Sequence, residues 1–272
     1  VQLLAEAPLE KVLLLWQGLG YYSRAHRIHQ ASIILSNISW PRTLQGWMDL
    51  PGIGRTTAGS ILSSAYDLPF PILDGNVRRL LSRLTACDVR DSLTVERKLW
   101  RISFLLLDKR RPRDFNQALM DMGALICIPR QPKCSICPVC ELCCAYAIGA
   151  PNDFPLKKHS TKPSVQVIGV GVIFNDVGDV LIDQRHNEGL LGGMWEFPGG
   201  KQHSEENIED TIAREIKEEL AIEVEVGKLV ISFDHAYSHK KLRFVVHLCR
   251  WIAGTPECLE CQQFSWVKYS EL

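Results

Sequence analysis

The sequence predicts two domains in one chain, an all-α domain followed by an α/β domain, and three observations support this assignment. The chain has 272 residues, long enough for each of two domains to bury a core of its own. Apolar residues recur at helical spacing almost throughout residues 1–126, as in Val12, Leu13 and Trp16. From Val165 onwards the pattern changes to β-branched runs with one strong helix between them.

Breaks in these patterns divide the chain into four segments. The expected segments are a helical domain at 1–126, a cysteine-rich loop at 127–148, a linker at 149–164 and an α/β domain at 165–272. The linker mixes Pro, Gly, Ser and Lys without periodicity. In the last segment we expect strands at 165–174, 180–184 and 242–248, and a helix at 206–220.

Composition indicates a soluble globular protein and gives no support for a membrane role. Hydrophobic residues make up 46% of the chain and charged residues 23%, and no apolar run is long enough to span a bilayer. The net charge is zero, yet residues 1–150 carry 18 basic and 12 acidic residues, which leaves 13 and 19 for the rest. This asymmetry suggests that the first half meets a polyanion, although chance differences between solvated surfaces give the same count.

The cysteines indicate a metal site rather than a disulfide framework. Six of the ten fall between Cys127 and Cys144, and no signal peptide precedes them. The chain begins at Val1 without an initiator Met and stops just after Ser270, which has the character of a helix cap. We therefore expect a fragment that is open at both ends.

Residues 50–59 read Leu-Pro-Gly-Ile-Gly-Arg-Thr-Thr-Ala-Gly, with Gly52 and Gly54 in a tight turn between two expected helices. The second helix would begin with free backbone N–H groups, and these together with the helix dipole suit a DNA phosphate. An ordinary helix–helix turn is the alternative. The segment Pro-Ile-Leu-Asp-Gly-Asn-Val-Arg-Arg follows at 71–79 and makes the DNA interpretation the better one.

In order and spacing this hairpin and the segment after it resemble the helix-hairpin-helix DNA glycosylases, and the Leu-Asp-Gly-Asn-Val run resembles the adenine DNA glycosylases of the MutY family. The resemblance implies that Gly52, Gly54, Arg55 and Thr56 bind DNA. It also implies that Asp74 is a catalytic carboxylate that stabilises the oxocarbenium-like sugar, with Asn76 orienting groups beside it. Related bifunctional enzymes carry a catalytic Lys where this chain has Thr56, so we expect base removal without lyase chemistry.

Four cysteines have the spacing C-x6-C-x2-C-x5-C, namely Cys127, Cys134, Cys137 and Cys143. This resembles the 4Fe-4S motif of the same glycosylases, while a structural zinc site is the competing interpretation. The loop would hold basic residues such as Arg130 and Lys133 against the DNA backbone. Cys140 and Cys144 are alternative ligands by position, but the family pattern gives them no role. We expect the four remaining cysteines to be buried or bystander thiols.

Two further segments resemble the parts of this family that recognise the lesion. Residues 18–27 contain Gly-Tyr-Tyr-Ser-Arg, which implies that Tyr21 wedges into the duplex beside the oxidised guanine and that Arg24 binds DNA. A pair of core aromatics on a helix is the structural alternative. Tyr237, Ser238 and His239 resemble the Phe-Ser-His loop that recognises 8-oxoguanine, although ordinary hairpin residues would read the same in isolation.

Residues 200–222 match the Nudix box at every charged position, with Ala221 where the pattern has Gly. On a helix Glu215, Glu218 and Glu219 share one face and are candidate ligands for Mg²⁺ near a diphosphate. Members of the MutY family usually carry this fold as a recognition domain with a degraded box. The better-preserved box leaves open a Nudix hydrolase of oxidised nucleotides such as 8-oxo-dGTP.

The resemblance implies a monofunctional base-excision repair enzyme that hydrolyses the N-glycosidic bond of adenine mispaired with 8-oxoguanine or guanine. Its general-acid Glu would lie upstream of Val1, so a non-catalytic, lesion-binding fragment remains the third hypothesis beside the glycosylase and the Nudix hydrolase. The expected cofactor is a 4Fe-4S cluster, with Mg²⁺ only if the box is active. The expected partner is double-stranded DNA carrying the mismatch, bound by a monomer in the cytoplasm.

Overall fold

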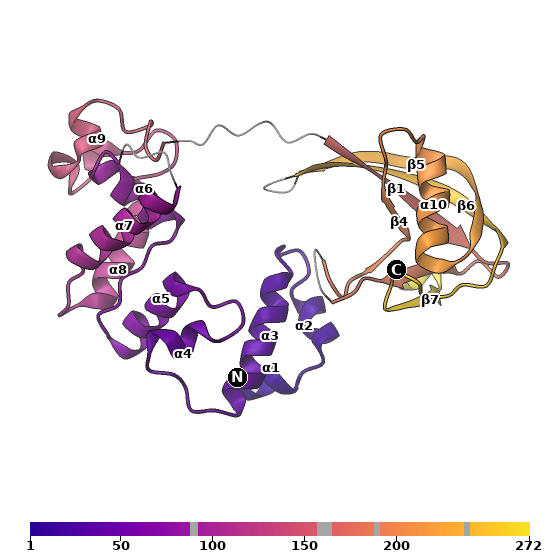
Figure 1. Cartoon of the computed structure of the whole chain (residues 1–272), viewed down its shortest axis with the longest axis horizontal. Helices are drawn as coiled ribbons and strands as arrows, with labels where there is room; N and C mark the ends of the chain where they lie inside the picture. Colours follow the sequence, from indigo (N-terminus) through magenta and orange to yellow (C-terminus); the bar gives the residue numbers. More distant parts are fainter. Residues whose placement is uncertain (88–91, 157–164, 188–190, 237–239) are drawn as a thin grey trace. The chain divides into compact units, whose positions relative to one another are not determined.

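The computed structural model describes residues 1–87, 92–156, 165–187, 191–236 and 240–272, and its secondary structure confirms the predicted fold class (Figure 1). The chain divides into two compact units. The first comprises Val1–Glu6 with Arg27–Ser160, and the second comprises Ala7–His26 with Thr161–Leu272. No helix in the described ranges is long and apolar enough to cross a bilayer.

The part of the chain before the linker is helical. Its α-helices are α1 (Gln2–Glu6), α2 (Leu9–Leu15), α3 (Ser23–Ser36), α4 (Leu44–Met48), α5 (Arg55–Tyr66), α6 (Gly75–Leu84), α7 (Ser92–Leu106), α8 (Pro112–Asp121) and α9 (Cys144–Ala147). A π-helical turn, η1 (Met122–Ile126), extends α8, and two 3-10 turns, η2 (Cys134–Ile136) and η3 (Cys140–Leu142), shape the cysteine loop.

Two apolar clusters support these helices. The smaller cluster joins α3, α4 and α5 through Ala31, Trp47, Leu50, Ala58 and Leu62. The larger one joins α6, α7 and α8 with the start of the cysteine loop, through Ile72, Leu73, Val77, Leu80, Leu81, Leu99, Trp100, Leu119 and Cys127. The burial of Val77, Leu80 and Leu81 fixes one face of α6 toward this core, so that the beginning of the helix is held beside the hairpin.

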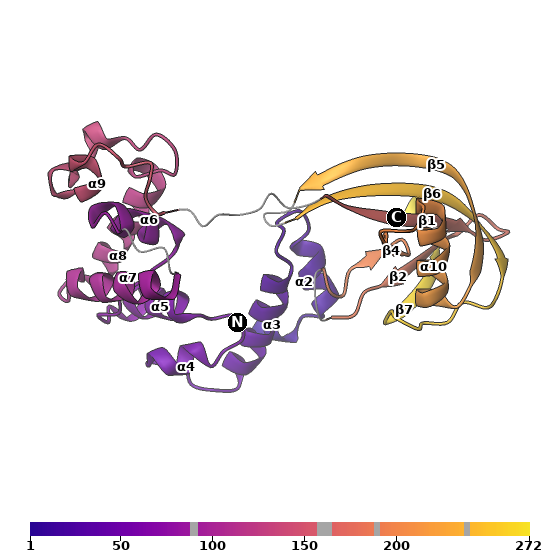
Figure 2. The same cartoon turned by 45° about the horizontal axis from the view of Figure 1, so that its top comes forward.

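The part of the second unit after the linker is built on a mixed sheet with one long helix. Its elements are β1 (Val165–Phe174), β2 (Val180–Gln184), β3 (Trp195–Glu196), β4 (Gly199–Lys201), α10 (Ile208–Leu220), β5 (Glu223–Ala236), β6 (Lys241–Ala253), β7 (Gln263–Val267) and η4 (Tyr269–Glu271). The order is β3-β2-β1-β6-β5, with β4 paired to β1 and β7 paired to β2. β1 and β6 are parallel, while β5 and β6 form a long antiparallel hairpin, seen well in Figure 2.

Glycines on β1 let α10 lie close against the sheet. A Cβ added at Gly169 would stand 2.7 Å from Ile212, and one at Gly171 would stand 2.6 Å from Ile216. Both isoleucines are fully buried, and their contact with β1 forms the centre of the apolar core between the sheet and α10. The helix begins at Ile208 rather than at Glu206, because the Asn207 side chain accepts a hydrogen bond from the Asp210 N–H and caps it.

Candidate functional site

The turn between α4 and α5 presents backbone N–H groups at the surface. Gly52 has φ +76°, and a Cβ there would stand 2.7 Å from the Arg27 side chain, so two constraints favour glycine. Gly54 is extended, with φ −87°, and caps α5 without any side-chain hydrogen bond. No atom lies within 4 Å of the place that a Cβ on Gly54 would occupy, which leaves room on that side for an anion to approach the first turn of α5.

Basic and aromatic side chains of α7 border this turn. Residues Gly54 to Thr57 line an open groove of about 730 Å³ together with Arg97, Trp100 and Arg101. The Arg55 guanidinium lies 4.1 Å from the centroid of the Trp100 ring, a cation–π contact that holds the charge at the rim of the groove. The groove combines a helix N-terminus with three arginines and one glutamate, Glu96, so its net positive charge suits a phosphate backbone.

Asp74 stands at the N-terminus of α6 and is fixed there as its cap. Its Oδ1 accepts a hydrogen bond of 2.7 Å from the Val77 N–H. The segment before it is tied to the hairpin helix, because the Leu73 N–H donates to the Thr56 hydroxyl over 3.3 Å. The sequence assigned Thr56 to DNA binding, and the structure shows that its hydroxyl also joins the hairpin to the carboxylate segment.

Asn76 connects α6 to the cysteine loop. Its Oδ1 accepts a hydrogen bond of 2.9 Å from Arg79, and the same guanidinium donates to the carbonyl oxygens of Cys127 and Gly123. Gly123 lies so close that a Cβ on it would stand 2.6 Å from the Cβ of Asn76. Asn76 thus belongs to a polar chain that runs from the carboxylate segment to the first cysteine of the loop.

The four predicted cluster cysteines line one cavity, which Arg83 and Lys133 also border. Burial raises the pKa of the Cys134 thiol, and the nearby Cys127, Cys143 and Cys137 raise it further. A group of thiolates that repel one another needs positive charge between them, and cluster iron supplies it. Four thiols around one cavity have the donor chemistry of an iron–sulfur cluster, although their side chains are not placed to hold a metal ion in this structure.

Arg83 is the residue that sequence reasoning missed in this region. It is only 2% exposed and donates to the carbonyl oxygens of Phe154, Ile128 and Pro129, at 3.1, 2.7 and 3.0 Å. Its Nη1 also donates to the Cys127 carbonyl oxygen and lies beside Cys127 Sγ, both at 3.3 Å. The only sequence signal was the i, i+4 spacing of Arg79 and Arg83, which places two charges on one side of α6.

Tyr21 is an exposed aromatic in a strained turn, which rules out the interpretation of this side chain as a core residue. It has φ +51° and is 65% exposed, and Gly18 and Gly20 on its N-terminal side also have positive φ. The Arg24 guanidinium lies 5.3 Å from the Tyr21 ring centroid and 5.5 Å from the Trp16 ring. A surface aromatic held by a turn and a cation is suited to stacking on a base.

Tyr237, Ser238 and His239 lie outside the described residues. The strands on either side are well paired, with Ala236 opposite Lys241 at the end of the β5–β6 hairpin. The Phe233 and Phe244 rings stack at 5.2 Å, and Asp234 pairs with Arg243. The predicted recognition loop therefore connects two strands that are paired up to Ala236 and Lys241.

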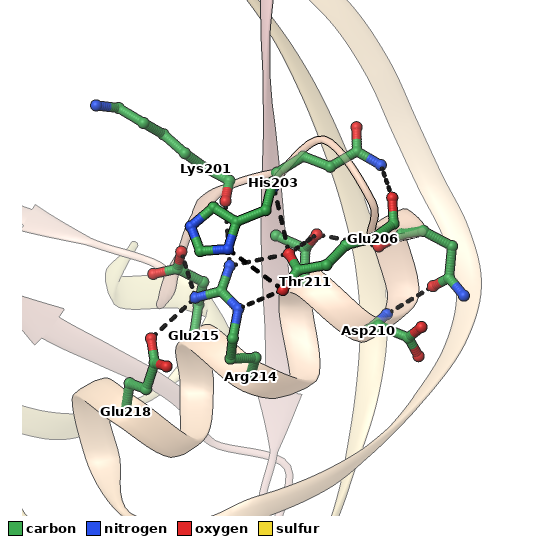
Figure 3. A network of polar contacts seen from close by, with 10 residues as sticks. Lys201, His203, Glu206, Asp210, Thr211, Arg214, Glu215 and Glu218 are labelled. Atoms are coloured by element: carbon green, nitrogen blue, oxygen red, sulfur yellow. Dashed lines mark hydrogen bonds and ion pairs between the residues drawn. The ribbon is translucent and has the colours of Figure 1, made fainter.

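The Nudix-box side chains form a network centred on Arg214 (Figure 3). Arg214 pairs with Glu206, Glu215 and Glu218 at 2.7, 2.9 and 2.9 Å. Hydrogen bonding to Arg214 lowers the pKa of Glu206 to about 2. A Cβ on Gly200 would stand 2.1 Å from the Glu215 carboxylate, which explains the glycine of the motif.

Glu219 points away from this network. Its Oε2 accepts a hydrogen bond of 2.9 Å from the Gly199 N–H. Burial raises the pKa of Glu219 to about 8, with the nearby Asp183 adding to the shift. Asp183 is itself buried beside Glu196, and its pKa is raised to about 7. Within the described residues, no three His, Cys, Asp or Glu side chains are placed to hold a metal ion.

Comparison with known families agrees with both halves of this arrangement. A model described as "HhH-GPD superfamily base excision DNA repair protein" matches residues 1–103, and one described as "NUDIX domain" matches residues 169–272. Fold and site thus define a helix-hairpin-helix base-excision repair protein with a Nudix domain.

Individual relatives narrow this class to one family. The chain is 33% identical to the adenine DNA glycosylase of Mus musculus, covering 91% of this chain and 58% of the relative. It is 34% identical to that of Buchnera aphidicola from Acyrthosiphon pisum, covering 91% and 69%. A thermostable thymine-DNA glycosylase structure is 26% identical, with a TM-score of 0.47 over 53% of this chain and 69% of that one. The chain belongs to the adenine DNA glycosylase family, and it spans little more than half the length of its mouse relative.

Proposed function

We propose that the protein removes adenine opposite 8-oxoguanine or guanine by hydrolysis of the N-glycosidic bond. The observation that carries the proposal is the position of Asp74, a carboxylate fixed at a helix N-terminus directly behind a DNA-binding hairpin. A carboxylate held there stabilises the positive charge that develops on the sugar as the bond to adenine breaks. Asn76 supports the same segment through Arg79.

The Asp74→Asn variant tests this role without removing the cap. Asparagine caps helices as well as aspartate does, so α6 and the hairpin stay in place. We expect single-turnover release of adenine by the full-length protein to fall by at least about 100-fold, while the Kd for the mismatched duplex changes little. Adenine release at the unmodified rate would contradict the assignment.

We further propose that base removal is not followed by strand cleavage. Thr56 occupies the position of the catalytic lysine in bifunctional relatives, and its hydroxyl is engaged by the Leu73 N–H. A hydroxyl there cannot form a Schiff base with the sugar. Borohydride should therefore trap no covalent complex with the product DNA; a trapped complex would show that another amine performs lyase chemistry.

For the cysteine loop we propose a 4Fe-4S cluster held by Cys127, Cys134, Cys137 and Cys143. Its chemistry is structural: it crosslinks a loop that carries Arg130 and Lys133, which would then contact the DNA backbone. The cavity lined by all four thiols supports the proposal. Metal analysis of purified protein should find iron and no stoichiometric zinc; the reverse result would replace the cluster by a zinc site.

In the second unit we propose that Tyr237, Ser238 and His239 read the oxidised base at the end of the β5–β6 hairpin. A hydrolase is the weaker candidate, because Arg214 pairs with both Glu215 and Glu218 while Glu219 is turned toward Gly199. We also propose that segments 1–126, 127–148 and 165–272 act as hairpin domain, cluster loop and recognition domain on double-stranded DNA.

A further inference from the structure

Residues 70–73, which lead into Asp74, have no regular secondary structure although most of them are buried. Pro71, Ile72 and Leu73 are buried and Phe70 is half-buried. Backbone polar groups that are buried outside a helix or sheet need hydrogen-bond partners from elsewhere in the fold. The partners of these four residues therefore determine where Asp74 stands.

Two buried polar side chains, one on α7 and one on α8, supply such partners. The Ser103 hydroxyl donates to the Ile72 carbonyl oxygen over 2.8 Å, and the Asn116 side-chain amide donates to the Phe70 carbonyl oxygen over 2.9 Å. Ser103 is 1% exposed and Asn116 is 2% exposed, so neither side chain is accessible to DNA. Their hydrogen bonds join residues 70–73 to two helices that are distant in sequence.

Helix α5 contributes a third hydrogen bond and a close contact. The Thr56 hydroxyl accepts the Leu73 N–H, and a Cβ on Gly59 would stand 2.5 Å from the Pro71 carbonyl oxygen. Each of the residues 70–73 thus meets one group from α5, α7 or α8. A change in any of these groups reaches Asp74 through the backbone.

Asn116 keeps its place at a cost in stability. Its Nδ2 also donates to the Ser63 hydroxyl oxygen over 2.9 Å, so both amide hydrogens are used. Its buried Oδ1 has no hydrogen-bond partner in the part of the chain that the structure describes. A buried acceptor without a partner lowers the stability of the fold. A local cost of this kind is typical of residues that serve a functional site.

We propose that Ser103 and Asn116 are positioning residues for the removal of adenine, which hold residues 70–73 so that the Asp74 carboxylate lies at its working distance from the sugar. Both side chains are buried, so they act through Asp74 and not on the DNA. A displacement of about 1 Å in a reacting group can lower a rate about 100-fold. This role rests on the proposed function of Asp74.

The first test measures single-turnover release of adenine by full-length Ser103→Ala and Asn116→Leu. The amplitude reports the fraction of folded enzyme, whereas the rate constant reports the chemistry. We expect the rate constant to fall about 10-fold in each variant, with amplitude and Kd for the mismatched duplex nearly unchanged. Smaller amplitudes with an unchanged rate constant would show that both residues only stabilise the fold, and would overturn the proposal.

Ser32→Ala is the matched control. Ser32 is also buried, at 4% exposed, but its hydroxyl donates to the His29 carbonyl oxygen of its own helix over 2.7 Å. We expect this variant to keep the unsubstituted rate constant. Ser103→Ala removes a single oxygen atom, so it decides the question if Asn116→Leu does not fold.

A second test combines Ser103→Ala with Asp74→Asn. If Ser103 acts through the carboxylate, its loss should lower the rate constant of Asp74→Asn much less than about 10-fold, because the charge that it positions is already gone. The same factor in both backgrounds would overturn the proposal. Failure of the proposed function is distinguishable, because Asp74→Asn would then release adenine at the unsubstituted rate.

Discussion

At the scale of single residues, the backbone of Ala221 adopts a left-handed conformation that is strained for alanine and unstrained for the glycine of the Nudix pattern. It ends α10 in the left-handed region, with φ 58°, at the position where the Nudix pattern has glycine. That conformation costs an L-residue about 1–2 kcal/mol, and the extra freedom of unfolded glycine offsets part of the gain. We expect Ala221→Gly to stabilise the second unit by about 0.5–1 kcal/mol.

Ala213→Gly is the matched control for that change, because Ala213 lies within the same helix. It should destabilise the unit by about 1 kcal/mol. Urea unfolding followed by far-ultraviolet circular dichroism measures both differences. A destabilising effect of Ala221→Gly would show that the left-handed turn is not strained.

Asp183 makes the stability of the second unit depend on pH. Burial and then Glu196 raise its pKa to about 7, well above the value of an unfolded aspartate near 3.9. A folded-state pKa above the unfolded one means that stability is fully present below pH 4 and is lost as the pH rises through 7. We expect amide exchange in β2, after correction for the intrinsic rate, to quicken between about pH 4 and pH 7 and Asp183→Asn to reduce this dependence; an unchanged dependence would contradict the assignment.

At the scale of elements, α6 joins the proposed catalytic carboxylate to the cysteine loop. Arg83→Lys keeps the charge but loses the planar fork that serves four carbonyl oxygens. Leaving buried acceptors without partners costs about 1–3 kcal/mol each, so we expect destabilisation of at least about 2 kcal/mol and faster amide exchange in residues 127–156. Arg78→Lys is the control, since its exposed pair with Glu96 is worth less than about 1 kcal/mol. Equal effects of the two changes would contradict the role of Arg83.

Helix α6 shows which features of the structure could be predicted from the sequence and which could not. Its beginning was predictable, because Asp74 is a capping residue followed by apolar positions at helical spacing. The burial of Arg83 was not, because charged residues are almost never fully buried and only the folded loop supplies its acceptors. The π-helical turn at Met122–Ile126 was also missed, since it follows from tertiary packing rather than from residue propensity.

Across the second unit the sequence identified the long helix and three strands, β1, β2 and β6, but it missed β3, β4, β5 and β7 and the arrangement of the box. Helical spacing placed Glu215, Glu218 and Glu219 on one face, whereas the structure turns Glu219 toward Gly199. Burial and the β4 backbone decide this orientation, and neither is visible in a sequence pattern. Gly200 could be located from the motif, but its close approach to the Glu215 carboxylate could not.

At the scale of the whole molecule, the uneven charge of the chain predicts how binding responds to salt. The first 150 residues carry 18 basic and 12 acidic residues, and Arg55, Arg97 and Arg101 border the hairpin groove. Contacts to phosphate release counterions, with a slope of about −0.9 in log K against log salt for each contact. We expect Arg97→Gln to reduce the magnitude of this slope by about one for any duplex, and Arg250→Gln in the acidic half to leave it unchanged. Equal slopes for both variants would place the DNA elsewhere.

The role of the second unit separates the two functions that the sequence left open. If it recognises the lesion, Tyr237→Ala with Ser238→Ala should reduce the preference for 8-oxoguanine over guanine opposite adenine, because those side chains would read the oxidised edge. Glu218→Gln should then hardly matter, since Glu218 is already neutralised by Arg214. If the unit is a hydrolase, the protein should convert 8-oxo-dGTP to its monophosphate in Mg²⁺, and Glu218→Gln should remove that activity by taking away a hard oxygen ligand. We expect lesion recognition, because the carboxylates of the box are either paired with Arg214 or turned toward Gly199. Turnover of 8-oxo-dGTP that Glu218→Gln abolishes would show instead that the box is a working active site.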